Sequence, residues 1–169
     1  MDATVQKVVM MDQNRIRRSL NRMAHEIMEK LHGESNLAVV GINRRGLAVA
    51  EQLAALLSDI GGHEVQALPL DVDEETKGID APDLAGRRVL LVDDVIFSGE
   101  TMFRALRMLS KKGLPAEVRI AALVDRGHRL YPLEAQFAGM SIPTKLKEHV
   151  AVEVEAEGML KAVVLHRNG

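Results

Sequence analysis

The stretch RVLLVDDVIFSGETMFRAL (residues 88–106) takes an apolar run into two adjacent aspartates and then through a turn into a second apolar pattern. The apolar run predicts a strand over residues 87–93 that is covered on both faces. The pattern from Thr101 to Gly113 has helical spacing. A buried strand that leads through a short loop into a helix is the repeating unit of α/β folds with a parallel sheet.

The rest of the chain continues this alternation. Strands are expected at residues 37–42, 64–70 and 116–125, and further helices at 11–33 and 46–62. In the first helix, Asp12 is the expected N-cap and Gly33 the expected stop. Its buried stripe is predicted to contain Ile16, Leu20, Met23, Ile27, Met28 and Leu31. The residues before it form a short arm, and the C-terminal β-like pieces 134–139, 150–155 and 161–166 either finish the sheet or form a small flap.

Composition narrows the function classes. The 169 residues, 47% hydrophobic and 27% charged, predict one globular domain over residues 1–169. The absence of cysteine excludes disulfides and thiolate metal sites. A net charge of -2 and 2% aromatic residues argue against a general nucleic-acid surface or a base-stacking platform. No apolar run approaches the ~18 residues that span a bilayer. With no signal peptide pattern at the N-terminus, we expect a cytoplasmic protein without a membrane partner.

Three segments fall at the carboxyl ends of predicted strands, where α/β sheets bind ligands. They are the loops NRRG (43–46), DDVIFSGET (93–101) and DRGHR (125–129). In the second loop, the turn at residues 98–101 offers backbone N–H groups, two hydroxyls and a helix N-terminus to a phosphate. Gly99 permits close approach of the backbone. Asp93 and Asp94 offer acceptors for sugar hydroxyls or a hydrated divalent cation, so a phosphorylated sugar fits the whole loop.

Two other interpretations compete with this one. An acidic pair after an apolar strand also occurs in Mg²⁺-binding receiver domains, but there it would follow the first strand rather than the third. An ordinary strand-to-helix turn capped by Ser98 or Thr101 needs no ligand. The double aspartate before the turn argues against that plain explanation.

The motif VLLVDDVIFSGET resembles the phosphoribosyl-pyrophosphate (PRPP) binding motif of type I phosphoribosyltransferases. Four more segments resemble one branch of that superfamily, the pyrimidine operon attenuator/uracil phosphoribosyltransferase family, in the same order. They are RIRRSLNRMAHEIME (15–29), VVGINRRG (39–46), LVDRGHRLYPL (123–133) and FAGMSIPTK (137–145). The resemblance implies an α/β, Rossmann-like parallel-sheet core with helices on both faces. It implies transfer of phosphoribose from PRPP to uracil, giving UMP and pyrophosphate.

The resemblance also implies roles for matching residues. Asp93 and Asp94 would contact the ribose hydroxyls and, with PRPP, Mg²⁺; together with Arg45 they form the expected catalytic set. The 5′-phosphate and PRPP site would comprise Val95, Ile96, Phe97, Ser98, Gly99, Glu100 and Thr101. The pyrophosphate loop would comprise Asn43, Arg44, Arg45 and Gly46. Asp125, Arg126 and His128 would lie near the base, although a loop salt bridge or a capping role is an alternative for Arg126 and His128.

Two departures from the family pattern bear on activity. The excursion that normally forms a basic hood is here DVDEETKGIDAPDLAG (71–86), a reduced segment with one basic residue, Lys77. Its acidic residues are Asp71, Asp73, Glu74, Glu75, Asp80 and Asp83. Glu100 also stands inside the phosphate turn. If its side chain faces solvent the backbone cradle survives, whereas an inward carboxylate would weaken phosphate binding.

A regulatory function is the rival hypothesis. Arg15, Arg18, Arg22 and His25 fall on one face of the first predicted helix, which in the resembling family contributes to a surface for leader RNA. Lys145 would add to that surface, while a solvated face or a subunit contact is the alternative. The chain would then be a nucleotide-sensing RNA-binding attenuator with little or no transferase activity; a transferase for another base is a third hypothesis. The resemblance further implies a homodimer or higher oligomer.

Overall fold

The computed structural model describes residues 5–32, 36–74 and 83–168. The predicted helix stop at Gly33 and the acidic-segment residues Glu75, Lys77 and Asp80 lie outside the described residues.

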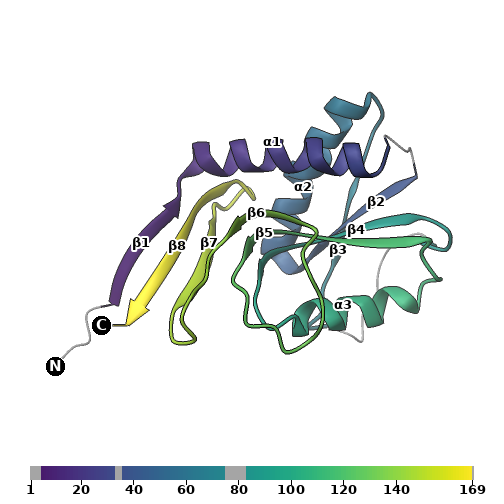
Figure 1. Cartoon of the computed structure of the whole chain (residues 1–169). Helices are drawn as coiled ribbons and strands as arrows, with labels where there is room; N and C mark the ends of the chain where they lie inside the picture. The colour runs from purple at the N-terminus through teal and green to yellow at the C-terminus, as the bar shows by residue number, and fades with distance from the viewer. Residues whose placement is uncertain (1–4, 33–35, 75–82, 169) are drawn as a thin grey trace.

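The centre of the molecule is a five-stranded parallel sheet with the order β3-β2-β4-β5-β6 (Figure 1). Its strands are β2 (Leu37–Ile42), β3 (Ala67–Leu70), β4 (Arg88–Ile96), β5 (Glu117–Asp125) and β6 (Phe137–Ser141). Strand β3 follows β2 on one side, whereas β4, β5 and β6 are added on the other side, so the direction of the strand order reverses between β2 and β4. Ligands bind at this point in such sheets. The predicted parallel α/β sheet is confirmed.

Helices cover both faces of this sheet, as predicted. Helices α1 (Gln13–Lys30) and α2 (Asn43–Gly61) lie on one face, and α3 (Glu100–Ser110) lies on the other. Every residue of β2 is buried, because alternate side chains enter the two cores. Val39 packs in the core beneath α1 and α2, while Val40 packs in the core beneath α3.

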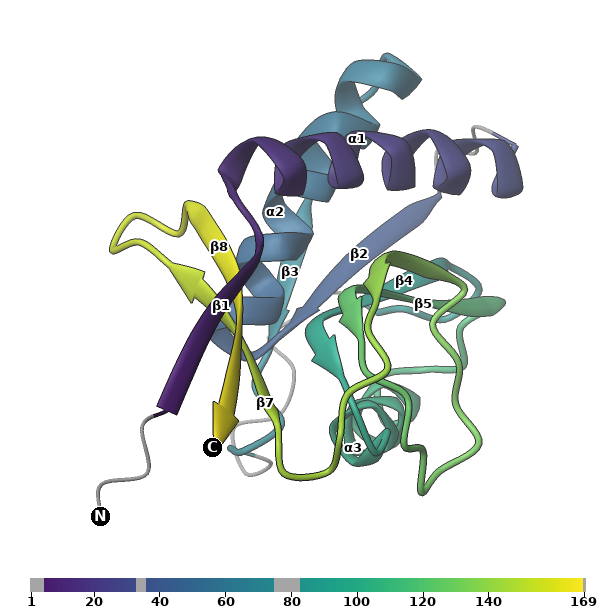
Figure 2. The ribbon, with the colours of Figure 1, turned by 60° about the vertical axis from the view of Figure 1, so that its left-hand side comes forward.

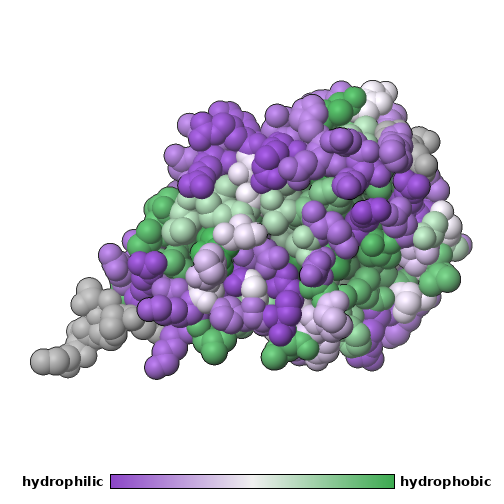
Figure 3. Space-filling model, in the orientation of Figure 1, coloured by the Kyte–Doolittle hydropathy of each residue, from purple (hydrophilic) through white to green (hydrophobic). Residues whose placement is uncertain are grey.

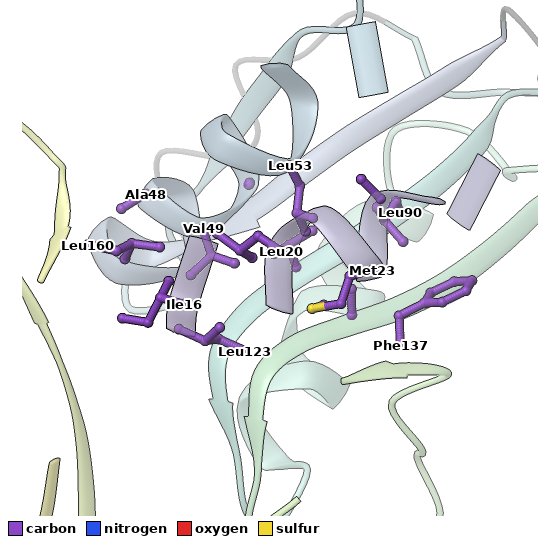
Figure 4. Close-up of a cluster of buried hydrophobic side chains, with 14 of the residues drawn as sticks. Ile16, Leu20, Met23, Ala48, Val49, Leu53, Leu90, Leu123, Phe137 and Leu160 are labelled. Carbon is purple, nitrogen blue, oxygen red and sulfur yellow. The ribbon is translucent and has the colours of Figure 1, made fainter. Parts of the chain in front are cut away.

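The first helix forms as the sequence predicts. The Asp12 carboxylate accepts a hydrogen bond from the Arg15 backbone N–H at 2.8 Å, a cap worth about 1 kcal/mol. The predicted apolar stripe is buried except Met28, which is half-buried against the same core. Figure 4 shows Ile16, Leu20 and Met23 of this stripe beside Val49 and Leu53 of α2. The stripe therefore fixes α1 to α2 and to the sheet.

A second, antiparallel sheet has the order β1-β8-β7. It contains β1 (Val5–Met11), β7 (His149–Val154) and β8 (Leu160–Asn168), and Figure 2 shows β1 and β8 side by side. The prediction of an arm before the first helix is therefore wrong for residues 5–10, and Met11, predicted as helical, is the last residue of β1. The strand was missed because most of its residues are exposed and its partner comes from the opposite end of the chain. Among the C-terminal pieces, the first finishes the parallel sheet and the other two form the separate sheet.

Three boundaries near the ligand edge differ from prediction. Helix α2 begins at Asn43, so residues 43–46 are its first turn rather than a loop. Strand β4 continues to Ile96, because Val95 and Ile96 still pair with Val124 and Asp125 of β5. Helix α3 begins at Glu100, which leaves only residues 97–99 as the connection. The candidate site is consequently built on regular elements rather than on long loops.

Candidate active site

A cavity of about 560 Å³, called the main cavity below, lies at the carboxyl ends of β2 and β4. The first turn of α2, the end of β4, the start of α3 and the strand β7 form its walls. Its lining residues are Ile42, Asn43, Arg44, Arg45, Asp93, Asp94, Val95, Thr101, Ala151, Val152, Glu153 and Val154. The structure thus brings together the first two predicted segments, 43–46 and 93–101.

The adjacent aspartates have different environments. Asp93 is buried, with 6% of its surface exposed, and its Oδ1 accepts a hydrogen bond from the Asp94 N–H at 2.8 Å. Burial raises the pKa of Asp93 well above its usual value, and the neighbouring charge of Asp94 raises it further. Asp94 is half-buried at the cavity. Side chains three residues apart in a regular strand point to opposite faces, yet Val92 and Val95 pack in the same core. The regular alternation of side chains is therefore interrupted at Asp93 and Asp94, and both aspartates can line one cavity.

The raised pKa of Asp93 makes a prediction about stability. Below pH 3.8, the unfolded-state value, Asp93 is protonated in both states and carries no penalty; as pH rises through the higher folded-state pKa, a buried charge must form. We expect Asp93→Asn, an uncharged near-isostere, to become more stable relative to the wild type as pH rises from about 4 to about 8. Urea denaturation across this range measures the difference. A difference that stays constant with pH would contradict the assignment.

The turn at residues 97–99 leads into α3 through Gly99, whose φ of 87° lies in the left-handed region. The N-cap Gly99 makes no side-chain cap, and the Ser98 hydroxyl accepts from the Glu100 N–H at 3.2 Å. A cavity of about 160 Å³ lies against Asp93 and residues 95–102. The Glu100 carboxylate pairs with Arg104 at 3.0 Å on the exposed surface of α3. Of the two alternatives for Glu100, the outward side chain is the one observed, and the backbone cradle is open to an anion.

The third predicted segment, residues 125–129, and the two residues after it form hydrogen bonds with this turn. The N–H groups of Leu130 and Tyr131 donate to the Ser98 carbonyl at 2.9 and 3.1 Å. Arg129 donates through Nη1 to the Phe97 carbonyl at 2.8 Å and pairs through Nη2 with Asp125 at 2.9 Å. These bonds hold the carbonyl groups of the turn toward residues 125–133. Sequence reasoning missed Arg129, whose signal was its position four residues after Asp125 in the segment DRGHR.

Replacing Arg129 by alanine is expected to destabilise the protein by about 2 to 3 kcal/mol, because several carbonyl groups and Asp125 lose their donor. Its side chain is 20% exposed, so water replaces these bonds incompletely. Urea denaturation measures the loss. Arg104→Ala is the matched control, since that arginine forms only an exposed pair with Glu100 and should change stability by less than about 0.5 kcal/mol. Equal effects of the two substitutions would contradict the supporting role.

The predicted base-binding residues all have partners within the protein. Arg126 is buried, donates to the Thr144 hydroxyl at 3.0 Å and lies 4.3 Å over the Phe97 ring. Burial lowers its pKa, and Glu148 opposes that shift. The His128 ring contacts the Thr144 carbonyl, and Asp125 accepts from the Gly127 N–H at 2.9 Å. Among the described residues, the contacts of Arg126 and His128 are hydrogen bonds to a hydroxyl and to backbone carbonyls, rather than the salt bridge or cap given as the alternative. Their role toward a base stays a prediction.

These residues line another cavity, of about 510 Å³, together with residues 141–145. Its outer part includes Lys145, which is exposed. The sequence prediction of a base-binding edge thus falls on a real concavity beside the end of β5.

In the first turn of α2, Arg44 and Arg45 are exposed at the main cavity. Within the described ranges neither has an ion-pair partner. Gly46 is buried where α2 meets β4, and a Cβ there would lie 3.0 Å from the Val92 carbonyl oxygen and 3.3 Å from Asp93 Oδ1. Glycine at this position therefore lets the helix N-terminus approach the aspartates closely.

The phosphoribosyl transferase domain family matches residues 10–157, which include every wall of the main cavity. The chain belongs to the phosphoribosyltransferase family. The predicted enzyme class and the sequence resemblance are confirmed. Proteins named "Bifunctional protein PyrR" are similar along most of their length. The one from Deinococcus radiodurans is 40% identical over 165 residues (90% of each chain), and the one from Pelotomaculum thermopropionicum is 39% identical over 174 residues (95% of this chain, 96% of that protein).

Solved phosphoribosyltransferases share the fold. Hypoxanthine phosphoribosyltransferase of Trypanosoma cruzi, in complex with IMP, superposes with a TM-score of 0.75 at 18% identity, covering 96% of this chain and 91% of that one. A hypoxanthine-guanine phosphoribosyltransferase from Bacillus anthracis gives a TM-score of 0.70 at 19% identity, with coverages of 83% and 85%. At these identities the likeness establishes the phosphoribosyltransferase fold.

The predicted RNA-binding residues of this phosphoribosyltransferase divide into two groups. Arg18 and His25 are exposed on α1, whose surface is largely hydrophilic (Figure 3). Arg22 instead donates to the carbonyls of Ala138 and Gly139 at 2.9 and 3.0 Å and pairs with Glu26. Arg22 therefore attaches α1 to the edge strand β6. In the part of the chain that the structure describes, no helix is long and apolar enough to cross a membrane.

Proposed function

We propose that this protein transfers phosphoribose from PRPP to uracil, forming UMP and pyrophosphate. The observation that carries the proposal is the arrangement along the cavity. Two cavities adjoin one another, because both are lined by Asp93, Val95 and Thr101. Along them lie the first turn of α2, whose arginines have no ion-pair partner among the described residues, then the Asp93–Asp94 pair, and then the start of α3. They suit pyrophosphate, ribose and 5′-phosphate in that order. The choice of uracil follows from the sequence resemblance.

In this reaction a uracil nitrogen forms a bond to C1 of the ribose while the bond from C1 to pyrophosphate breaks. The bonding electrons leave with pyrophosphate, and the proton of the uracil nitrogen is released to solvent. Positive charge develops on the sugar ring, beside which the Asp94 carboxylate would lie. Arg44 and Arg45 would neutralise the departing anion. Asp93, whose pKa is raised, would accept or donate a hydrogen bond at a ribose hydroxyl without adding a full second charge.

Magnesium fits this site as an ion that arrives with the substrate. Among the described residues there is no group of three or more His, Cys, Asp or Glu side chains that could hold a metal. Mg²⁺ is commonly bound by one or two carboxylates together with substrate phosphates. Asp94, with Asp93 behind it, would supply the protein ligand, and the ion would screen the pyrophosphate charge.

We place the base toward the cavity lined by Asp125, Arg126, His128 and residues 141–145. Because Thr144 and Glu148 hold the Arg126 side chain, this residue would shape the base site rather than move to meet the ligand. Homo-oligomer formation belongs to the same proposal and rests on the sequence resemblance, and we propose a cytoplasmic location as the sequence led us to expect.

The direct test supplies the purified protein with PRPP, Mg²⁺ and a panel of nucleobases, and measures pyrophosphate release. Uracil should give the highest kcat/KM, and the nucleotide product should be UMP. If none of the bases supports pyrophosphate release, the enzymatic proposal is contradicted. Preference for a different base would overturn the choice of uracil alone.

RNA-binding attenuation is the second candidate function, favoured by the exposed Arg18 and His25 on α1 and by the sequence resemblance. A gel shift with a pyrimidine-operon leader RNA, with and without UMP, tests it. We expect Arg18→Ala to weaken binding and to reduce the salt slope by about 1, as for one lost phosphate contact. Absence of RNA affinity at low salt would exclude this function, because phosphate contacts are strongest there.

A further inference from the structure

Asn43 combines an unusual backbone conformation with an unusual set of side-chain contacts. Its φ of 55° lies in the left-handed region, which asparagine tolerates better than most residues other than glycine. It stands where β2 ends and α2 begins, and it lines the main cavity. The direction in which the chain enters the first turn of α2 therefore depends on this residue.

The Asn43 side chain is turned away toward the segment that follows β3. Its Oδ1 accepts from the Val72 N–H at 3.1 Å, and its Nδ2 donates to Asp73 Oδ2 at 3.4 Å. A backbone N–H can only donate, so the amide oxygen must be the atom that faces Val72. Val72 is 2% exposed, and its buried N–H needs a partner within the protein.

The first residues of the acidic segment, Asp71 to Asp73, also form a hydrogen bond with one another next to this contact. Asp71 Oδ1 accepts from the Asp73 N–H at 3.0 Å, which closes a local turn. The Asp73 carboxylate meets the Asn43 amide, so at least one acid of this segment serves a structural contact near the cavity. The contact also joins two parts of the site that are distant in sequence, the end of β3 and the start of α2.

We propose that Asn43 is a positioning residue for pyrophosphate: its clamp to Val72 and Asp73 fixes the left-handed conformer that aims the N–H groups of residues 44 and 45, and the side chains of these two arginines, at the leaving group. The inference rests on the proposed function, since it assigns pyrophosphate to this turn. A turn that is already fixed loses less entropy when the anion binds. Asn43 itself bonds to the protein and need not touch the ligand.

Asn43→Gly is the decisive variant, because glycine keeps the left-handed φ at no steric cost and removes both side-chain bonds. Calorimetry with inorganic pyrophosphate and Mg²⁺ should show an affinity about 10-fold lower than the wild type, equivalent to one lost hydrogen bond of about 1.4 kcal/mol. Affinity for ribose 5-phosphate, which uses the turn before α3, should not change. In steady state the KM for PRPP should rise more than kcat falls. Hydrogen exchange of the Val72 amide should become faster.

Ala55→Gly is the matched control, since it adds a glycine at an exposed position of the same helix. It should leave both ligand affinities unchanged. Wild-type pyrophosphate affinity in Asn43→Gly, or an equal loss of pyrophosphate and ribose 5-phosphate affinity, would overturn the positioning role. A wild-type protein that binds neither ligand would instead remove the proposed function, and this inference with it.

Discussion

Asp94→Asn is expected to lower the affinity for PRPP by about 10- to 100-fold, the cost of a lost charged hydrogen-bonding partner. Asp94 is the half-buried carboxylate at the main cavity, whereas Asp93 is buried behind it with a raised pKa. The charge that meets ribose and Mg²⁺ therefore comes mainly from Asp94. The double variant Asp93→Asn/Asp94→Asn should abolish PRPP binding and leave the fold intact. Calorimetry with PRPP and Mg²⁺ measures binding, and circular dichroism checks the fold.

Asp59→Asn supplies the control for this experiment, since it makes the same change of charge at an exposed position of α2 away from the cavity. Its PRPP affinity should equal that of the wild type. If the double variant retains wild-type affinity, the aspartate pair is structural. If Asp93→Asn alone lowers the PRPP affinity more than Asp94→Asn does, then Asp93 rather than Asp94 is the main ligand of ribose and Mg²⁺.

Gly41→Ala is expected to cost about 3 kcal/mol of stability, at the upper end for overpacking, because the neighbouring atoms belong to backbone. A Cβ at Gly41 would lie 2.4 Å from Leu47 Cα, 2.8 Å from Leu47 N and 2.9 Å from Ala50 Cβ. The start of α2 would have to move away from β2. Since Arg44 and Arg45 are on that turn, the substitution should also weaken pyrophosphate binding. Urea denaturation and pyrophosphate calorimetry measure the two effects.

Gly61→Ala is the comparison for this prediction, as it places a methyl group at the other end of α2. There the nearest atoms are side-chain tips, His63 Cε1 and Met28 Cε, each 3.0 Å away. These tips can shift, so stability should stay within about 1 kcal/mol of the wild type. If Gly41→Ala is as stable as Gly61→Ala and binds pyrophosphate normally, close packing of α2 on β2 does not position the turn.

Local patterns in the sequence were sufficient for the regular parts of the fold. Asp12 is an N-cap because its side chain reaches an N–H three residues away, and the apolar stripe of α1 follows directly from helical periodicity. The apolar run from Val89 to Val92 follows the burial of both faces of the strand. The motif around Asp93 and Gly99 located the main cavity for the same reason, since its chemistry is contained in consecutive residues.

Contacts between distant segments were beyond such patterns. Strand β1 exists through its pairing with β8, and Val5 and Val9 remain exposed, so no clear alternation reports it. The burial of Asp93 depends on the approach of Gly46 from another element. Arg22, which was predicted to bind RNA, donates hydrogen bonds to two carbonyls of β6 that lie more than a hundred residues later in the chain. The contacts of Asn43 with Val72 and Asp73 are of the same kind.

A crystal structure with PRPP and Mg²⁺ bound would show directly whether this cavity is the transfer site. We expect the 5′-phosphate on the backbone N–H groups of residues 98–101, the ribose hydroxyls at Asp94, and pyrophosphate on the first turn of α2 beside Arg44 and Arg45. Asn43 should keep its left-handed conformation and its bond to Val72 in that complex. A 5′-phosphate bound away from the 98–101 turn, or pyrophosphate away from α2, would contradict the assignment of this cavity as the phosphoribosyl transfer site.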